Sequence, residues 1–160
     1  MKTLIAVLMT LFVAIPLAVS QDVDKKTDNH KFNKAEYLVA TAAGQVKAGT
    51  PVKGTLFFDN EKKTVSFLQK SGSSILDIKY DNIKNITYEK SSKPRYAEAV
   101  LISPLFLLSN SKKHYLTFQY DDASGQGKYA IVHLDKKNAQ EAVACAEAQT
   151  GKRVEQIAEK

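Results

Sequence analysis

The chain has 160 residues, a formal net charge of +6, 44 % hydrophobic residues and one cysteine. That length accommodates one domain, and a lone Cys145 excludes a small scaffold held together by disulfides within the chain. The basic residues are scattered in pairs, such as Lys62-Lys63 and Lys136-Lys137. Nucleic-acid binding needs basic residues gathered on one face, so we expect no nucleic-acid partner.

Residues 1–20 carry the pattern of a secretory signal peptide. Lys2 is the only charged residue there, the run 4–15 is almost wholly apolar, and Ala18 and Ser20 supply small residues after it. A charged start, an apolar centre and a small-residue cleavage site define such segments. An uncleaved membrane anchor would need roughly 20 apolar residues. We therefore expect cleavage after Ser20 and an exported protein, either periplasmic or secreted.

Residues 21–36 are polar and contain two strong hydrophobes, Val23 and Phe32. Such a segment buries too little apolar surface to offset its ordering entropy, so we predict a flexible polar leader. From about Tyr37 the pattern changes to short segments rich in β-branched and aromatic residues. We assign residues 37–160 to a single domain.

Six segments between residues 55 and 134 alternate apolar and polar side chains, as strands with one buried face do. Turn residues separate them, for example Asp59-Asn60 between the first two segments. The predicted strands are Thr55–Phe58, Thr64–Gln69, Ile75–Tyr80, Ile83–Glu89, His114–Tyr120 and Tyr129–Leu134.

A further segment, 97–108, reads AEAVLISPLFLL and is apolar on both sides of a strand. Pro104 cannot donate to a sheet ladder and keeps Ser103 out of the helical region. We therefore predict a central strand that is broken or bulged at this pair. A strand with two apolar faces needs cover on both. Either the leader or residues 37–43 pack over the outer face, or that face is an exposed contact patch.

The exposed alternative defines a candidate contact site for a membrane or a partner protein. Apolar side chains lying below cations that face anionic headgroups are typical of proteins bound at a membrane surface. The candidate site consists of three apolar residues and three basic residues that precede them, Leu105, Phe106, Leu107, Lys90, Lys93 and Arg95.

The end of the chain changes to a helical period. Apolar residues recur at positions i, i+3, i+4 and i+7 from Ala139 to Ala146. Asp135 or Asn138 can cap the start of this helix, and Gly151 is placed for a left-handed C-cap. The small alanines would let the helix approach a sheet closely. Beyond Gly151 we expect only a frayed continuation.

About seven antiparallel strands followed by one closing helix resemble the pleckstrin-homology-like superfamily, with its GRAM-like and bacterial members. The resemblance covers roughly residues 44–154. The segments that carry it are 54–59 in the first hairpin, 78–86 around a central isoleucine, 113–118 and the final helix. The resemblance implies a mainly β fold with one C-terminal α-helix, in which the helix caps a bent antiparallel sheet or small open barrel.

In eukaryotic domains of that superfamily, Lys and Arg residues around the first hairpin bind phosphoinositides. Here Lys53, Lys62 and Lys63 are present without an arginine. The basic signature is incomplete, and we do not infer that activity.

Candidate catalytic and ligand sites are few. His114 and His133 lie in predicted strands that could be neighbours, but two ligands are too few to define a zinc site. Gly125-Gln126-Gly127 precedes a strand and not a helix, which favours a hairpin loop over a nucleotide-binding loop. Cys145 among alanines is predicted to fill the core. We expect no metal, no cofactor and no catalytic activity.

Three functions are compatible with these patterns. The first is an exported, non-enzymatic binding module that contacts a protein or the envelope surface. The second is a carrier or sensor of an apolar ligand, such as a lipid, held between the sheet and the helix. The third is a hydrolase, for which the sequence offers no motif. A filled interior would favour the first function over the second.

Overall fold

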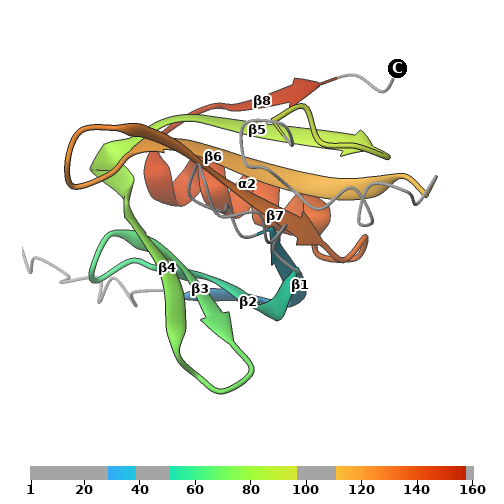
Figure 1. The fold of residues 1–160 in the computed structure, drawn as a ribbon, viewed down its shortest axis with the longest axis horizontal. Helices are drawn as coiled ribbons and strands as arrows, with labels where there is room; N and C mark the ends of the chain where they lie inside the picture. Colours follow the sequence, from blue (N-terminus) through green and yellow to red (C-terminus); the bar gives the residue numbers. More distant parts are fainter. Residues whose placement is uncertain (1–28, 39–50, 97–110, 158–160) are drawn as a thin grey trace, which may run out of the picture.

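The computed structural model describes residues 29–38, 51–96 and 111–157. Within these ranges eight strands form one mixed sheet, in the order β4-β3-β2-β1-β7-β6-β5-β8, and helix α2 packs against it (Figure 1). The elements in chain order are β1 His30–Leu38, β2 Val52–Asp59, β3 Thr64–Gln69, β4 Ser74–Lys79, the 3₁₀ turn η1 Tyr80–Asn82, β5 Ile83–Ser91, β6 Lys113–Asp121, β7 Gly127–Leu134, α2 Ala139–Thr150 and β8 Val154–Ile157. The sheet is not closed, because its end strands β4 and β8 are not paired with each other.

Strand β1 joins the two halves of the sheet. It pairs with β2 along its length, whereas only its last residues, Glu36–Leu38, also pair with β7. A β-bulge between Asn33 and Ala35 leaves Lys34 at a φ of 59°. Bulges bend a strand and increase its twist. In Figure 1 the β2–β3–β4 half accordingly turns away from the β7–β6–β5–β8 half at this strand.

Helix α2 lies in the angle between the two halves (Figure 1). Ala142 and Ala146 are fully buried, and Val143 is 4 % exposed. These residues belong to the same core cluster as Leu56 of β2 and Phe118 of β6. The sheet and the inner face of the helix therefore share one apolar core, and the predicted closing helix is confirmed. No helix in the described ranges is long and apolar enough to span a membrane.

The two ends of α2 differ in how well they were predicted. Gly151 has a φ of 67° and donates its N–H to the carbonyl of Glu147 at 3.0 Å, which confirms the left-handed C-cap. Asn138 occupies the N-cap position without a side-chain capping bond. Its amide Nδ2 donates instead to the carbonyl of Asn33 at 2.8 Å. Asn138 therefore does not cap the helix with its side chain. Asp135, the other predicted residue, accepts the N–H of Lys137 at 2.9 Å in the turn before the helix.

Residues 30–36, predicted as part of a flexible leader, form most of β1, so the leader prediction does not hold for them. Phe32 is 3 % exposed and Ala35 is 1 % exposed. The segment looks polar because its outward positions carry side chains such as Lys31 and Glu36. The buried face of this segment packs against strands that come later in the chain, and this packing is enough to order residues 30–36.

The end of the chain also differs from the prediction. Instead of a frayed continuation, residues Val154–Ile157 form β8, which runs parallel to β5. The sheet is therefore mixed and not wholly antiparallel. Each of the six predicted strands is present, with bounds shifted by a few residues at most. The central strand predicted at 97–108 and the signal peptide at 1–20 lie outside the described residues.

Candidate binding surfaces

The three basic residues predicted for the contact site converge at the end of β5. Lys90, Lys93 and Arg95, together with Lys112 before β6, line a hollow of about 320 Å³, which we call the basic hollow. The remaining lining residues are Glu89, Ser91, Ser92 and Ile157. Cationic side chains around a concave surface raise the local concentration of anions. The apolar members of the predicted site, Leu105–Leu107, lie outside the described residues.

A buried carboxylate fixes the shape of the basic hollow. Glu89 is 4 % exposed, and its Oε1 accepts a hydrogen bond from the backbone N–H of Arg95 at 2.7 Å. The hydroxyl of Ser91 donates to the carbonyl of Lys93 at 2.8 Å and lies 3.4 Å from Oε2 of Glu89. A buried carboxylate is tolerated only with such partners. Glu89 therefore holds the turn that carries two of the cationic residues.

The sheet face that carries Glu89 is the outer one, opposite the main core. The strand register places Glu36, His133, Tyr115 and Glu89 in one row across β1, β7, β6 and β5. Burial raises the pKa of Tyr115 to about 12, and the negative charges of Glu89 and Glu36 act in the same direction. The hydroxyl of Tyr115 therefore stays protonated at neutral pH.

A second apolar cluster occupies the same outer face. Leu38, Tyr115 and Ile131 are each at most 1 % exposed, and Tyr96 and Tyr129 pack against them. The rings of Tyr96 and Tyr129 are stacked, with centroids 4.7 Å apart. Sequence reasoning missed this cluster because it assigned only one buried face to the six alternating strands. The signal was present, since Tyr115 and Ile131 occupy the supposedly solvated positions of β6 and β7.

The two strand histidines do not form a ligand pair. Their strands are neighbours, but His114 lies opposite Leu134, and His133 lies opposite Tyr115, so the rings are on different faces. His114 Nδ1 is 2.6 Å from the hydroxyl of Tyr88, and burial, with the nearby charge of Lys90, lowers the pKa of His114. His133 Nδ1 is 3.1 Å from a carboxylate oxygen of Glu36.

The other candidate reactive groups have structural roles. Cys145 is 7 % exposed, and burial raises the pKa of its thiol to about 12, as expected of a core residue. Gly125, at a φ of 78°, lies in the loop between β6 and β7, where Asp122 Oδ1 accepts the N–H of Gln126 at 3.0 Å. Within the described ranges, no group of three or more His, Cys, Asp or Glu residues could hold a metal ion.

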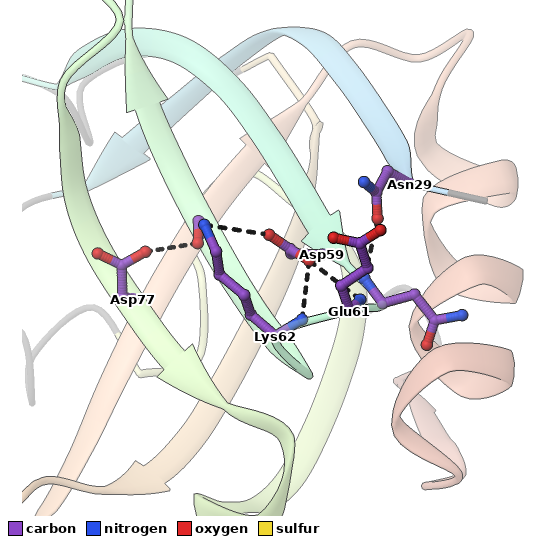
Figure 2. A network of polar contacts seen from close by, with 7 residues as sticks. Asn29, Asp59, Glu61, Lys62 and Asp77 are labelled. Atoms are coloured by element: carbon purple, nitrogen blue, oxygen red, sulfur yellow. Dashed lines mark hydrogen bonds and ion pairs between the residues drawn. The ribbon is translucent and has the colours of Figure 1, made fainter. Parts of the chain in front are cut away.

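The β2–β3 hairpin uses its lysines for its own structure (Figure 2). Asp59 Oδ1 accepts the N–H groups of Glu61 at 3.0 Å and Lys62 at 2.9 Å, and Lys62 Nζ lies 3.6 Å from Oδ2. The Lys62 N–H is the main cause that holds the pKa of Asp59 below its usual value, and burial opposes it. Lys63 Nζ donates to Asn60 Oδ1. Neither lysine is directed to a ligand site by these contacts.

Comparison of the chain with models of known protein families found no match, and comparison with curated proteins found none either. The functional argument therefore depends on the fold and the surfaces described above.

Proposed function

We propose that the protein is an exported, non-enzymatic binding module with a pleckstrin-homology-like fold, which docks on an anionic membrane surface of the cell envelope. The fold proposal is supported by strands β1 to β7, which pair with one another in antiparallel fashion, and by the helix that follows them and lies in the bend of the sheet. Export is supported by the signal-peptide pattern of residues 1–20.

The observation that carries the docking proposal is the basic hollow. Lys90 lies on β5, Lys93 and Arg95 lie in the turn after it, and Lys112 lies beside β6, yet all four line one concavity. Each cationic side chain near an anionic membrane contributes about 1 kcal/mol to binding. Leu105–Leu107 would add apolar contacts beneath the headgroups.

The alternative, a carrier of an apolar ligand, is less well supported. A ligand held between sheet and helix would need space beside Ala142 and Ala146, and both residues are fully buried in the main core. A larger hollow of about 640 Å³ lies at the rim instead, where Glu147, Arg153 and Glu155 line it. These charged side chains suit solvent better than a lipid chain.

Co-sedimentation with vesicles tests the docking proposal. We expect the protein to bind vesicles that contain phosphatidylglycerol and not vesicles of phosphatidylcholine alone. The triple variant Lys90→Gln/Lys93→Gln/Arg95→Gln should bind about 100-fold more weakly, because three contributions of about 1 kcal/mol are lost. Phe106→Asp should also weaken binding, because it places a charge among the apolar contacts.

The matched control, Lys79→Gln/Lys152→Gln/Arg153→Gln, removes the same charge from residues that do not line the basic hollow. It should retain nearly all of the binding. Equal losses in the two triple variants would mean that net charge alone attracts the protein, and the hollow would have no special role. Absence of binding to either kind of vesicle would refute membrane docking and leave a protein partner as the alternative.

A further inference from the structure

A second cationic surface follows the bend of β1. Lys34, Lys53 and Lys70 line a hollow of about 420 Å³, and Lys34 also lines an adjoining hollow of about 190 Å³ with Lys31 and Lys137. Because Lys34 belongs to both hollows, the five lysines form a continuous line, which we call the lysine stripe. None of the five residues lines the basic hollow.

The fold, and not sequence proximity, assembles the lysine stripe. Lys34 is the bulged residue of β1 and Lys31 precedes it on the same strand. Lys53 lies on β2 opposite Glu36, and Lys70 follows β3. Lys137 comes from the turn before α2. Three residues of strand span about 10 Å, and two strand spacings span about another 10 Å. The stripe is therefore longer than a single anionic group and suits an extended ligand.

The lysine stripe carries excess positive charge. Within the described part of the chain, Lys34, Lys70 and Lys137 form no ion pair. Lys53 Nζ lies 4.0 Å from Glu36, whose other oxygen is 3.1 Å from His133. Two carboxylates, Glu36 and Asp135, also line the hollows, so the five lysines leave an excess of positive charge. Such an excess along a connected pair of hollows favours a polyanion.

The lining groups indicate what kind of polyanion fits. Among the described residues, the only ring in contact with a lysine of the stripe is Phe57, and Lys31 Nζ already lies 5.4 Å from its centroid. Single-stranded nucleic acids bind where aromatic side chains stack with bases, and the described residues of the stripe offer no free ring of this kind. Uncharged polar groups are present instead, with the Thr55 hydroxyl donating to Asn33 Oδ1 at 2.9 Å inside the larger hollow. Amide and hydroxyl groups can both donate hydrogen bonds to sugar hydroxyls and accept hydrogen bonds from them.

We propose that the lysine stripe is a binding site for an acidic polysaccharide, separate from the membrane-docking hollow. Lysines act as point charges for carboxylate, sulfate or phosphate groups along the polymer, without the fixed fork of arginine. The affinity should fall steeply with added salt, because the contacts are mainly between exposed charges.

The test is a calorimetric titration of the full chain with a heparin oligosaccharide, which measures the dissociation constant. Neutral dextran serves as the reference ligand. The variant Lys34→Gly/Lys53→Gln/Lys70→Gln should bind at least about tenfold more weakly, because three of the five charges are lost. Glycine is chosen at position 34 because it accepts the positive φ of the bulge. If the triple variant fails to fold, Lys34→Gly/Lys70→Gln preserves the contact between Lys53 and Glu36.

The variant Lys90→Gln/Lys93→Gln/Arg95→Gln is the control, since it removes the same charge from the basic hollow. It should bind the oligosaccharide like the unaltered protein, whether or not the membrane proposal holds. Equal weakening in both variants would overturn the assignment of the site. Tighter binding of an oligothymidylate of equal charge would overturn the assignment of the ligand class.

Discussion

At the scale of single residues, Gly54 shows how closely the bent sheet is packed. A Cβ at this position would lie 2.1 Å from the carbonyl oxygen of Leu68 and 2.6 Å from the ring of Phe67. Because the oxygen belongs to the backbone, the sheet itself would have to move. We expect Gly54→Ala to lower the free energy of unfolding by about 2–3 kcal/mol, as overpacking does. Gly127→Ala, where a Cβ meets nothing within 4 Å, should leave the urea midpoint almost unchanged.

Asp59 makes the stability of the β2–β3 hairpin depend on pH. Its pKa is lowered in the folded state, chiefly by the N–H of Lys62. Its stabilising contribution is therefore complete above the unfolded-state value of about 4, and is lost as the pH falls through the lower folded value. Asp59→Asn should destabilise the protein at pH 7 and flatten the decline in stability below pH ~4. An unchanged acid profile of urea unfolding would contradict this role.

At the scale of elements, β8 is the shortest of the described strands and lies at an edge of the sheet. Of its four residues only Val154 is buried, and the N–H of that residue donates to Glu147 Oε1 at 2.8 Å. We expect Glu147→Ala to loosen β8 without unfolding the rest of the sheet. Amide hydrogen exchange at residues 154–157 should become roughly tenfold faster, as expected for the loss of one hydrogen bond to a charged group. Glu141→Ala, on the first turn of the same helix, should not accelerate exchange there.

The elements also show which features a sequence can reveal. Strands such as β3 and β6 were predictable because their alternation is local, and α2 because its alanines recur at helical spacing. Strand β1 was missed because its outward residues are polar and its partners are distant. Strand β8 was missed because four residues carry too short a pattern. The lysine stripe was missed, as was Lys112, the fourth cationic residue of the basic hollow. Both depend on the fold bringing together residues that are distant in sequence.

At the scale of the whole molecule, the two proposed surfaces belong to different halves of the sheet. The basic hollow lies at the end of β5, in the half that contains β7, β6 and β8, whereas most of the lysine stripe lies on β1, β2 and the end of β3. The two ligand classes can therefore be tested independently by charge-matched variants. Simultaneous binding would connect a membrane surface to a polysaccharide through one small domain.

The seam between the halves has a consequence for the order of folding. Glu36 and His133, which meet across β1 and β7, are 97 positions apart in the chain. The meander from β1 to β4 can assemble as soon as its own residues are available, but the other half cannot join it until β7 has emerged. Contacts of such long sequence separation slow folding. We therefore expect closure of the seam to be a late step: a chain that emerges from its N-terminus would pair β1 with β7 only after most of its residues were available.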